Sequence, residues 1–119
     1  MKLSSHFDST EFDCHHCHKG GEDMDPALLE LLETLREHFN KPVAIMSGYR
    51  CPAHNKAVGG AKRSQHLLGT AADVKVKDTT PKAVADFLNT QKEAKGLGRY
   101  PTFTHVDVRQ GNKARWGHN

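Results

Sequence analysis

Three strong polar side chains alternate with apolar residues near the end of the sequence. The segment 103–109 predicts a strand, because apolar residues occupy every second position. His105, Asp107 and Arg109 fall on the positions between them and so share one face of that strand. A second alternating segment upstream carries Asp73 on its polar face. A histidine beside carboxylates on one sheet face can bind a metal ion or transfer a proton.

His66 lies in the loop before Asp73 and adds a second histidine to these candidates. Two histidines and one carboxylate form a ligand set of catalytic zinc sites, in which water takes the fourth position. Bound zinc lowers the pKa of that water to about 7 and so provides hydroxide near neutral pH. A single histidine on a sheet face is more commonly a surface or hydrogen-bonded residue. The metal interpretation therefore depends on several ligands converging.

The chain has nine histidines and three cysteines, and this enrichment also points toward metal. Two of the cysteines form the cluster Cys14-His15-His16-Cys17-His18. With Cys51 and one flanking histidine, Cys14 and Cys17 could form a structural Cys₃His zinc site. The alternatives are free buried thiols, or a disulfide that joins Cys51 to one of the other two cysteines in an oxidising compartment.

Size and charge limit the classes of protein to consider. A chain of 119 residues fits one domain, which we expect to span residues 1–119. The chain lacks the run of about 18 apolar residues that a membrane-spanning helix needs. The net charge of +3 is spread along the chain, which argues against a nucleic-acid partner. No apolar run follows Met1, so we expect no secretory signal and synthesis in the cytoplasm.

The remaining sequence predicts the elements that must position these residues. Asp25 and Pro26 begin a helix with a leucine stripe, and Asn40 ends it. Before this helix we expect an irregular N-terminal layer at 1–24, anchored by Phe7 and Phe12. After it we expect a strand at 43–46, turns at 47–70 and a strand at 71–77. A helix begun by Thr80 and Pro81, a glycine-rich loop at 95–101 and a strand at 103–109 complete the chain order. This order predicts an α+β fold with a small, mostly antiparallel sheet and flanking helices.

Three ordered motifs resemble the M15 zinc peptidases, the group of D-Ala-D-Ala carboxypeptidases and peptidoglycan endopeptidases. The first is Ser47-Gly48-Tyr49-Arg50-Cys51-Pro52, and the second, from Ser64 to Asp73, has the form S-x-H-x-x-G-x-A-x-D. The third combines Gly96-Leu97-Gly98-Arg99-Tyr100-Pro101 with Thr104-His105-Val106-Asp107-Val108-Arg109. The resemblance runs from about residue 5 to Trp116 and is closest to the small single-domain members of phage and bacteria. It implies the fold shared by the Hedgehog domain and the DD-peptidases.

The resemblance also implies roles for individual residues. His66, Asp73 and His105 would be the ligands of a catalytic zinc ion, whose bound water attacks the peptide carbonyl. Arg50 would lie beside the metal and stabilise the developing oxyanion. Ser64 and Gln65 precede the first of these histidines and could bind the substrate backbone or hold the loop, and Tyr100 and Trp116 could line the cleft or belong to the core.

The sequence departs from the better-known members at the general base. The acidic residue that they carry three positions before the last histidine ligand is replaced here by Thr102. Asp107 is the expected replacement, because it lies two residues after His105 on the same strand face. The alternative is that Asp107 orients His105 or pairs with Arg109.

The expected activity is hydrolysis of a peptide bond in the peptidoglycan stem peptide. The bond could be D-Ala-D-Ala, L-Ala-D-Glu or one in a cross-bridge, and the sequence leaves this choice open. The alternative is a catalytically inactive, zinc-stabilised binding module of the Hedgehog type. We expect a monomer that acts on the cell wall and that, if it is a phage endolysin, reaches the wall through lysis or a membrane pore.

Overall fold

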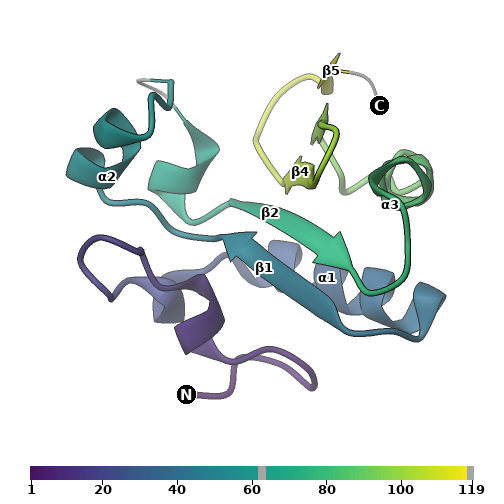
Figure 1. The fold of residues 1–119 in the computed structure, drawn as a ribbon, viewed down its shortest axis with the longest axis horizontal. Helices are drawn as coiled ribbons and strands as arrows, with labels where there is room; N and C mark the ends of the chain where they lie inside the picture. The colour runs from purple at the N-terminus through teal and green to yellow at the C-terminus, as the bar shows by residue number, and fades with distance from the viewer. Residues whose placement is uncertain (62–63, 118–119) are drawn as a thin grey trace.

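Five strands form one sheet in the computed structural model, which describes residues 1–61 and 64–117 (Figure 1). The strands are β1 (Val43–Ser47), β2 (Ala71–Val76), β3 (Gly96–Arg99), β4 (Thr104–Asp107) and β5 (Ala114–Gly117). Their order across the sheet is β1-β2-β4-β3-β5, and all neighbours are antiparallel except β3 and β5. The predicted α+β class is therefore confirmed.

The two longer helices begin where their local sequence predicts, and the first also ends there. Helix α1 (Pro26–Phe39) begins after Asp25, whose carboxylate accepts a hydrogen bond from the backbone N–H of Ala27. It ends at Asn40, which adopts the left-handed conformation common after a helix. Helix α3 (Pro81–Leu88) is capped in the same way by the side chain of Thr80. The shorter elements are α2 (Pro52–Ala57) and the 3₁₀ helices η1 (Ser9–Phe12), η2 (Gly21–Asp23) and η3 (Gln65–Leu68).

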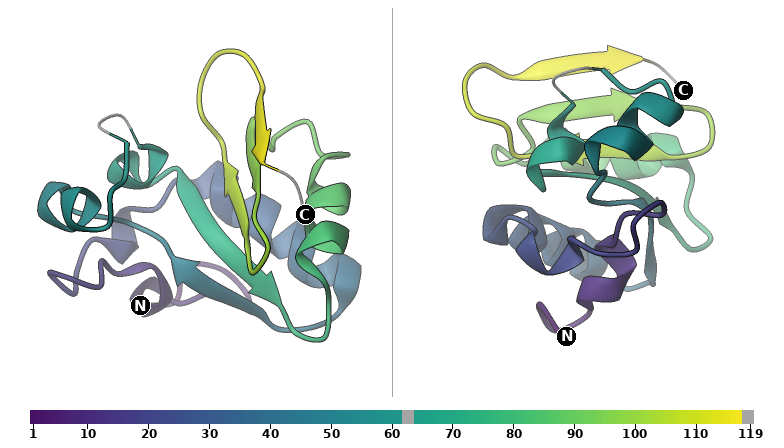
Figure 2. Two further views of the ribbon diagram at one scale, coloured as in Figure 1. Left: turned by 45° about the horizontal axis from the view of Figure 1, so that its top comes forward. Right: turned by 90° about the vertical axis from the view of Figure 1, so that its left-hand side faces the viewer.

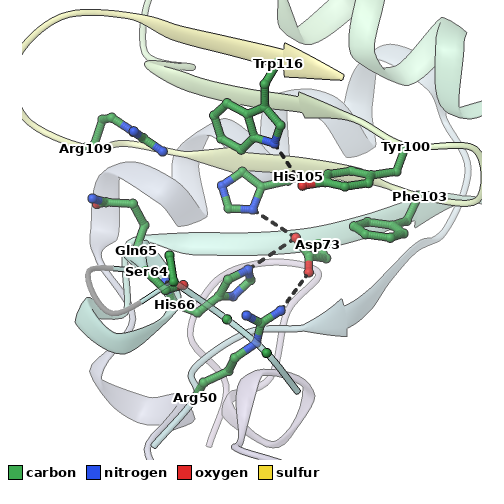
Figure 3. Close-up of a pocket in the computed structure, with 13 residues that line it drawn as sticks. Arg50, Ser64, Gln65, His66, Asp73, Tyr100, Phe103, His105, Arg109 and Trp116 are labelled. Atoms are coloured by element: carbon green, nitrogen blue, oxygen red, sulfur yellow. Dashed lines mark hydrogen bonds and ion pairs between the residues drawn. The ribbon is translucent and has the colours of Figure 1, made fainter. Parts of the chain in front are cut away.

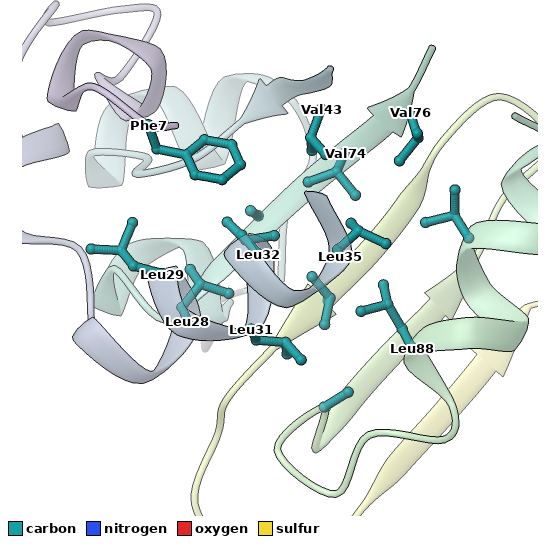
Figure 4. Packing of buried hydrophobic residues seen from close by; sticks show 14 of the residues in the cluster. Phe7, Leu28, Leu29, Leu31, Leu32, Leu35, Val43, Val74, Val76 and Leu88 are labelled. Atoms are coloured by element: carbon teal, nitrogen blue, oxygen red, sulfur yellow. The ribbon is translucent and has the colours of Figure 1, made fainter. Parts of the chain in front are cut away.

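The hydrophobic core lies on one face of the sheet, under α1 and α3 (Figure 4). Alternation in β2 directs Ala72, Val74 and Val76 toward this core and Asp73 toward the opposite face. The leucines of α1 pack against these residues, and full burial of each such side chain contributes about 1.5–3 kcal/mol. One face of the sheet therefore provides stability, and the other is left for polar side chains.

The N-terminal layer, residues 1–24, packs against α1 and β1 (Figure 2). Phe7 and Phe12 are fully buried, as the sequence predicts, and join the same hydrophobic cluster as the leucines of α1. Glu33 on α1 accepts hydrogen bonds from the Ser4 hydroxyl and from the backbone N–H of His6. Apolar and polar contacts thus both connect this irregular segment to the rest of the chain.

The expectation of a glycine-rich loop at 95–101 is wrong, because Gly96–Arg99 is strand β3. Glycine weakens a strand unless a neighbouring group needs the space, and here two groups do. A Cβ atom at Gly96 would lie 2.1 Å from the Asp107 carboxylate, and one at Gly98 would lie 2.5 Å from the Trp116 indole. Strand β5, which pairs with β3 in parallel and carries Trp116, has no counterpart among the predicted elements.

No helix in the described parts of the chain combines the length and the apolar character that crossing a bilayer would require.

Candidate metal centre

One row of register partners runs across the whole sheet and forms the floor of the site. Ser47 pairs with Asp73, Asp73 with His105, His105 with Gly98, and Gly98 with Trp116. Partners in a row project to the same face, which here is the face opposite the core. Because Gly98 has no side chain, the indole of Trp116 reaches over it and its ring lies 5.0 Å from that of His105. The sequence suggests Trp116 as a residue of the cleft or of the core, and the structure places its ring beside His105.

The short helix η3 carries His66 over this row. The Ser64 hydroxyl caps η3 by accepting a hydrogen bond from the backbone N–H of His66. Gly69, with φ +72°, ends η3 in the left-handed conformation that glycine adopts without strain. The backbone N–H of Arg50 donates to the carbonyl of His66. These contacts hold His66 against the segment that carries Arg50.

His66, Asp73 and His105 converge on one point, and all three are buried (Figure 3). His66 Nε2 lies 3.2 Å from Asp73 Oδ1, and His105 Nδ1 lies 3.0 Å from the same oxygen. The structure therefore brings together the residues that the resemblance implies as metal ligands. They come from η3, β2 and β4.

In each candidate histidine ligand, the ring nitrogen that points away from Asp73 forms a hydrogen bond with another group. His66 Nδ1–H donates to the carbonyl oxygen of Gly48 at 2.7 Å. His105 Nε2–H donates to Asp107 Oδ2 at 2.7 Å. In the neutral form of both rings the protons lie on these two nitrogens, so that His66 Nε2 and His105 Nδ1 present lone pairs toward Asp73.

Three acceptor atoms facing one another repel unless a cation lies among them. Two imidazole nitrogens and one carboxylate oxygen suit zinc, and carbonyl or carboxylate partners behind the histidines are typical of zinc sites. The residues that converge here thus fit the metal. His66 Nε2, Asp73 Oδ1 and His105 Nδ1 would be the coordinating atoms.

The same contacts shift the pKa values of Asp73 and His105. Burial by itself would raise the pKa of Asp73, but hydrogen bonds to His105 and His66 outweigh it and hold that pKa far below its ordinary value. Burial by itself would lower the pKa of His105, but hydrogen bonds to Asp107 and Asp73 raise it.

Asp107 is enclosed behind His105 and is absent from the cavity lining. Its side chain has no exposed surface, and both of its oxygens accept hydrogen bonds from the Arg109 guanidinium, at 2.8 and 2.7 Å. Burial alone would raise the pKa of Asp107, but Arg109 and His105 lower it well below its ordinary value. This geometry favours the alternative in which Asp107 orients His105 and pairs with Arg109, and it gives the general-base expectation no support.

Arg50 reaches the centre from the segment after β1. Its Nη2 lies 3.3 Å from Asp73 Oδ2, while Nε and Nη1 donate to Ser47 and Asn55. Three anchored nitrogens fix the plane of the guanidinium beside the candidate ligands. Arg50 therefore has the position that the resemblance implies.

A cavity of about 440 Å³ opens above the candidate ligands. The predicted substrate-binding residues Ser64, Gln65 and Tyr100 all line it, together with Arg109 and others. Its remaining described lining is Arg50, Gly59, Gly60, Ala61, His66, Asp73, Phe103, His105 and Trp116. Two arginines, three aromatic rings and one carboxylate line the described part of the cavity, and each arginine is already paired with an aspartate, Arg50 with Asp73 and Arg109 with Asp107.

All three predicted substrate-binding residues also make contacts within the protein that support the site. The Gln65 side chain accepts a hydrogen bond from the hydroxyl of Thr70, and Ser64 caps η3. The Tyr100 hydroxyl accepts a hydrogen bond from the Trp116 indole at 2.8 Å, and its ring stacks on Phe103. Tyr100 and Phe103 thereby form an aromatic wall of the cavity.

Thr102 lies outside this cavity and is exposed. The position that is acidic in the better-known zinc peptidases therefore contributes nothing to the described lining. Asp73 is the one carboxylate among the described lining residues.

A second group of metal-binding side chains lies apart from the candidate centre. The sulfur atoms of Cys14, Cys17 and Cys51 all lie within 4.8 Å of one another, and all three are free thiols. The structure therefore brings together the three cysteines that the sequence suggests as a possible structural site.

Two histidines, an aspartate and an arginine that gather over one sheet face in a substrate-sized cavity form an arrangement that suits a metal-dependent hydrolase. The chain matches the family model described as Peptidase M15 over residues 5–107. It therefore belongs to the M15 peptidase family, whose members are zinc-dependent metallopeptidases. A search of the curated proteins found no match.

Proposed function

We propose that this protein hydrolyses peptide bonds in the stem peptide of peptidoglycan. The observation that carries the proposal is the convergence of His66 Nε2, Asp73 Oδ1 and His105 Nδ1 in the floor of a cavity that also presents Arg50. Membership of a peptidase family supports the reaction class. The masses of the digestion products would distinguish carboxypeptidase from endopeptidase activity.

Zinc held by His66, Asp73 and His105 would polarise a carbonyl and lower the pKa of water. The residues around it determine what the substrate meets. Arg50 is fixed by Ser47, Asn55 and Asp73, so its guanidinium can stabilise negative charge on a carbonyl oxygen without reorganising.

The cavity also suits the charge of the proposed substrate. Stem peptides are short and carry free carboxylates, and the Arg50 guanidinium lies beside the candidate metal ligands, where it and a bound cation would face such a group. Arg109 also lines the cavity, but its charge is neutralised by Asp107. The aromatic wall of Tyr100 and Phe103 can pack against the aliphatic part of the same peptide.

Asp107 is proposed to act as a positioning residue. Its Oδ2 accepts from His105 Nε2–H and so fixes the tautomer in which Nδ1 is free to bind metal. Arg109 neutralises the buried carboxylate with two hydrogen bonds. In this role Asp107 does not take the proton from water or pass one to the leaving amine.

A second candidate function is a zinc-stabilised module that binds peptidoglycan without cleaving it. The observation in its favour is that the described lining contains no carboxylate besides Asp73, whose oxygens already face His66, His105 and Arg50. The metal and the arginine side chains would then bind a peptide carboxylate, and this binding needs no general base.

Digestion of purified peptidoglycan separates the two functions. We expect soluble fragments whose masses identify the cleaved bond, loss of cleavage after chelation and recovery with added zinc. His66→Ala should abolish cleavage, whereas His38→Ala, a histidine on α1 outside the cavity lining, should not. Binding to peptidoglycan with no fragment at any zinc concentration would overturn the peptidase proposal and favour the binding module.

The proposed site of action follows from the proposed substrate. A protein that cleaves stem peptides must reach the cell wall, either by export or after lysis. Labelled protein added to intact cells, permeabilised cells and isolated walls would show which barrier has to be opened before digestion starts.

A further inference from the structure

A cluster of three thiols joins two segments that lie far apart in the chain. Cys14 and Cys17 belong to the N-terminal layer, and Cys51 lies immediately before α2. Their sulfur atoms all lie within 4.8 Å of one another. The peptidase chemistry described above uses none of them.

The surroundings of the sulfur atoms suit thiolates bound to a cation. Cys14 is fully buried, and its Sγ accepts hydrogen bonds from the backbone N–H groups of Cys51 and His16, each at 3.4 Å. Cys51 Sγ accepts another from the backbone N–H of His54 at 3.4 Å. Backbone donors of this kind stabilise negative charge on sulfur, and three adjacent thiolates would repel one another without a metal.

A histidine completes a second short motif. Cys51 and His54 are three residues apart, as are Cys14 and Cys17, so the cluster consists of a Cys-x-x-Cys pair and a Cys-x-x-His pair. The His54 ring contacts two residues of the turn between the N-terminal cysteines, with its centroid 5.9 Å from that of His15 and 6.5 Å from that of His16. Its nitrogens lie outside the group formed by the three sulfur atoms, so the ring would have to turn toward them to bind the same ion. Three sulfurs and one nitrogen are a common ligand set of closed, structural zinc sites.

We propose that Cys14, Cys17, Cys51 and His54 bind a second zinc ion, which has a structural role. Binding would displace the protons of the three thiols, so that the ion compensates the charge of the cluster. With four protein ligands no position would remain for water, and this site would not take part in hydrolysis.

The position of the cluster indicates what the ion would stabilise. The segment 48–51 contacts the N-terminal layer through the hydrogen bond from Tyr49 N–H to the Phe12 carbonyl. The same segment contacts the candidate active site, because Gly48 accepts from His66 and Arg50 follows directly. A zinc ion between Cys51 and the other two cysteines would thus fix the segment from which Arg50 extends.

Metal content measured with and without the catalytic ligands tests this inference independently of the proposed function. We expect two zinc atoms in the wild-type chain, one for each group of candidate ligands, and one in the double variant His66→Ala, His105→Ala. A folded double variant without zinc overturns the inference. One zinc atom in both proteins would instead support the cysteine site and contradict the catalytic metal.

Cobalt replacement identifies the ligands without requiring that a cysteine variant fold. Cobalt bound by thiolates gives an intense charge-transfer absorption in the near ultraviolet, which histidine and carboxylate ligands do not give. We expect this absorption in the His66→Ala, His105→Ala double variant, and we expect Cys17→Ser to weaken it. Cobalt binding without the thiolate band would overturn the proposal, as would a purified chain whose mass under non-reducing conditions reveals a disulfide.

The fourth ligand has its own matched control. His54→Ala should speed the transfer of zinc from this site to a chelator by about 10-fold or more, and His18→Ala should leave the rate unchanged. Equal rates in both variants would overturn the assignment of His54. Trypsin cleavage after the exposed Lys19 should also be slow in the zinc-loaded protein and fast after chelation, if the ion orders this layer.

Discussion

His105 and Asp73 are register partners on β4 and β2, and His105 Nδ1 lies 3.0 Å from Asp73 Oδ1. The partner of His105 on its other side is Gly98, which leaves the space that the Trp116 indole fills. The pair therefore lies between an aromatic ring and Arg50, in the centre of one row across the sheet. The geometry of this pair therefore depends on Asp107, on Arg50 and on the glycines of β3.

Asp107→Asn removes the charge behind His105 while keeping nearly the same shape. Because Asp107 fixes the tautomer of His105, we expect the zinc dissociation constant to rise about 10- to 100-fold, with activity largely recovered at high zinc. Isothermal titration with zinc, followed by peptidoglycan digestion at each zinc concentration, measures both quantities. A general base would behave differently, with unchanged zinc affinity and activity that no amount of zinc restores.

Arg50→Ala removes the guanidinium that faces both Asp73 and the cavity. We expect kcat/KM to fall about 10²- to 10³-fold, because a fixed donor for the oxyanion is lost while zinc stays bound. Arg50→Lys should recover little, since an ammonium group cannot reproduce the contacts to Ser47, Asn55 and Asp73 at once. Steady-state kinetics with zinc analysis provides the measurement. Lys75→Ala, which removes an exposed charge from β2, should leave both values unchanged.

Gly96→Ala tests the space that β3 leaves for Asp107. The new methyl group would lie 2.1 Å from Asp107 Oδ2, so the carboxylate or the strand must shift. We expect a loss of about 1–3 kcal/mol of unfolding free energy, typical of overpacking, together with weaker zinc binding. Urea denaturation and zinc titration measure these effects.

Gly98→Ala is the comparison for Gly96→Ala, because its methyl group would meet the Trp116 indole instead. We expect this variant to change the fluorescence of Trp116, the chain's one tryptophan, while the contacts of Asp107 remain. If both variants changed zinc affinity equally, the space beside Asp107 would have no special role.

Glu33→Gln tests how the N-terminal layer is held on α1. Burial alone would raise the pKa of Glu33, but hydrogen bonds from Ser4 and His6 outweigh it and lower that pKa below its ordinary value. A lowered folded pKa stabilises the protein above the unfolded pKa, and this contribution disappears as the pH falls through the folded value. We expect the variant to lose about 1 kcal/mol at pH 7 and the difference to shrink below about pH 4.5.

Urea denaturation of both proteins between pH 3 and pH 7 measures this difference, and protonation of shared groups cancels in the comparison. Glu37→Gln, an exposed change on the same helix, should follow the wild type at every pH. A difference between wild type and Glu33→Gln that grows toward low pH would contradict the assignment.

The sequence by itself determined the elements whose signals are local. The caps Asp25 and Thr80, the leucine stripe of α1 and the alternation in β2 and β4 all depend on residues a few positions apart, and each prediction is confirmed. Alternation also placed Asp73 and His105 on polar strand faces. The ordered motifs then allowed the family to be recognised before the fold was known.

The tertiary structure decided everything that depends on contacts distant in sequence. The glycines of β3 indicate a loop until the Asp107 carboxylate and the Trp116 indole are seen to need their space. The role of Asp107 depends on which nitrogen of His105 it contacts, and strand spacing cannot specify that. Cys51 meets Cys14 and Cys17 only because the N-terminal layer folds back over the segment after β1. Local periodicity carries no information on such approaches, because they are set by how the packed elements fill space around one core.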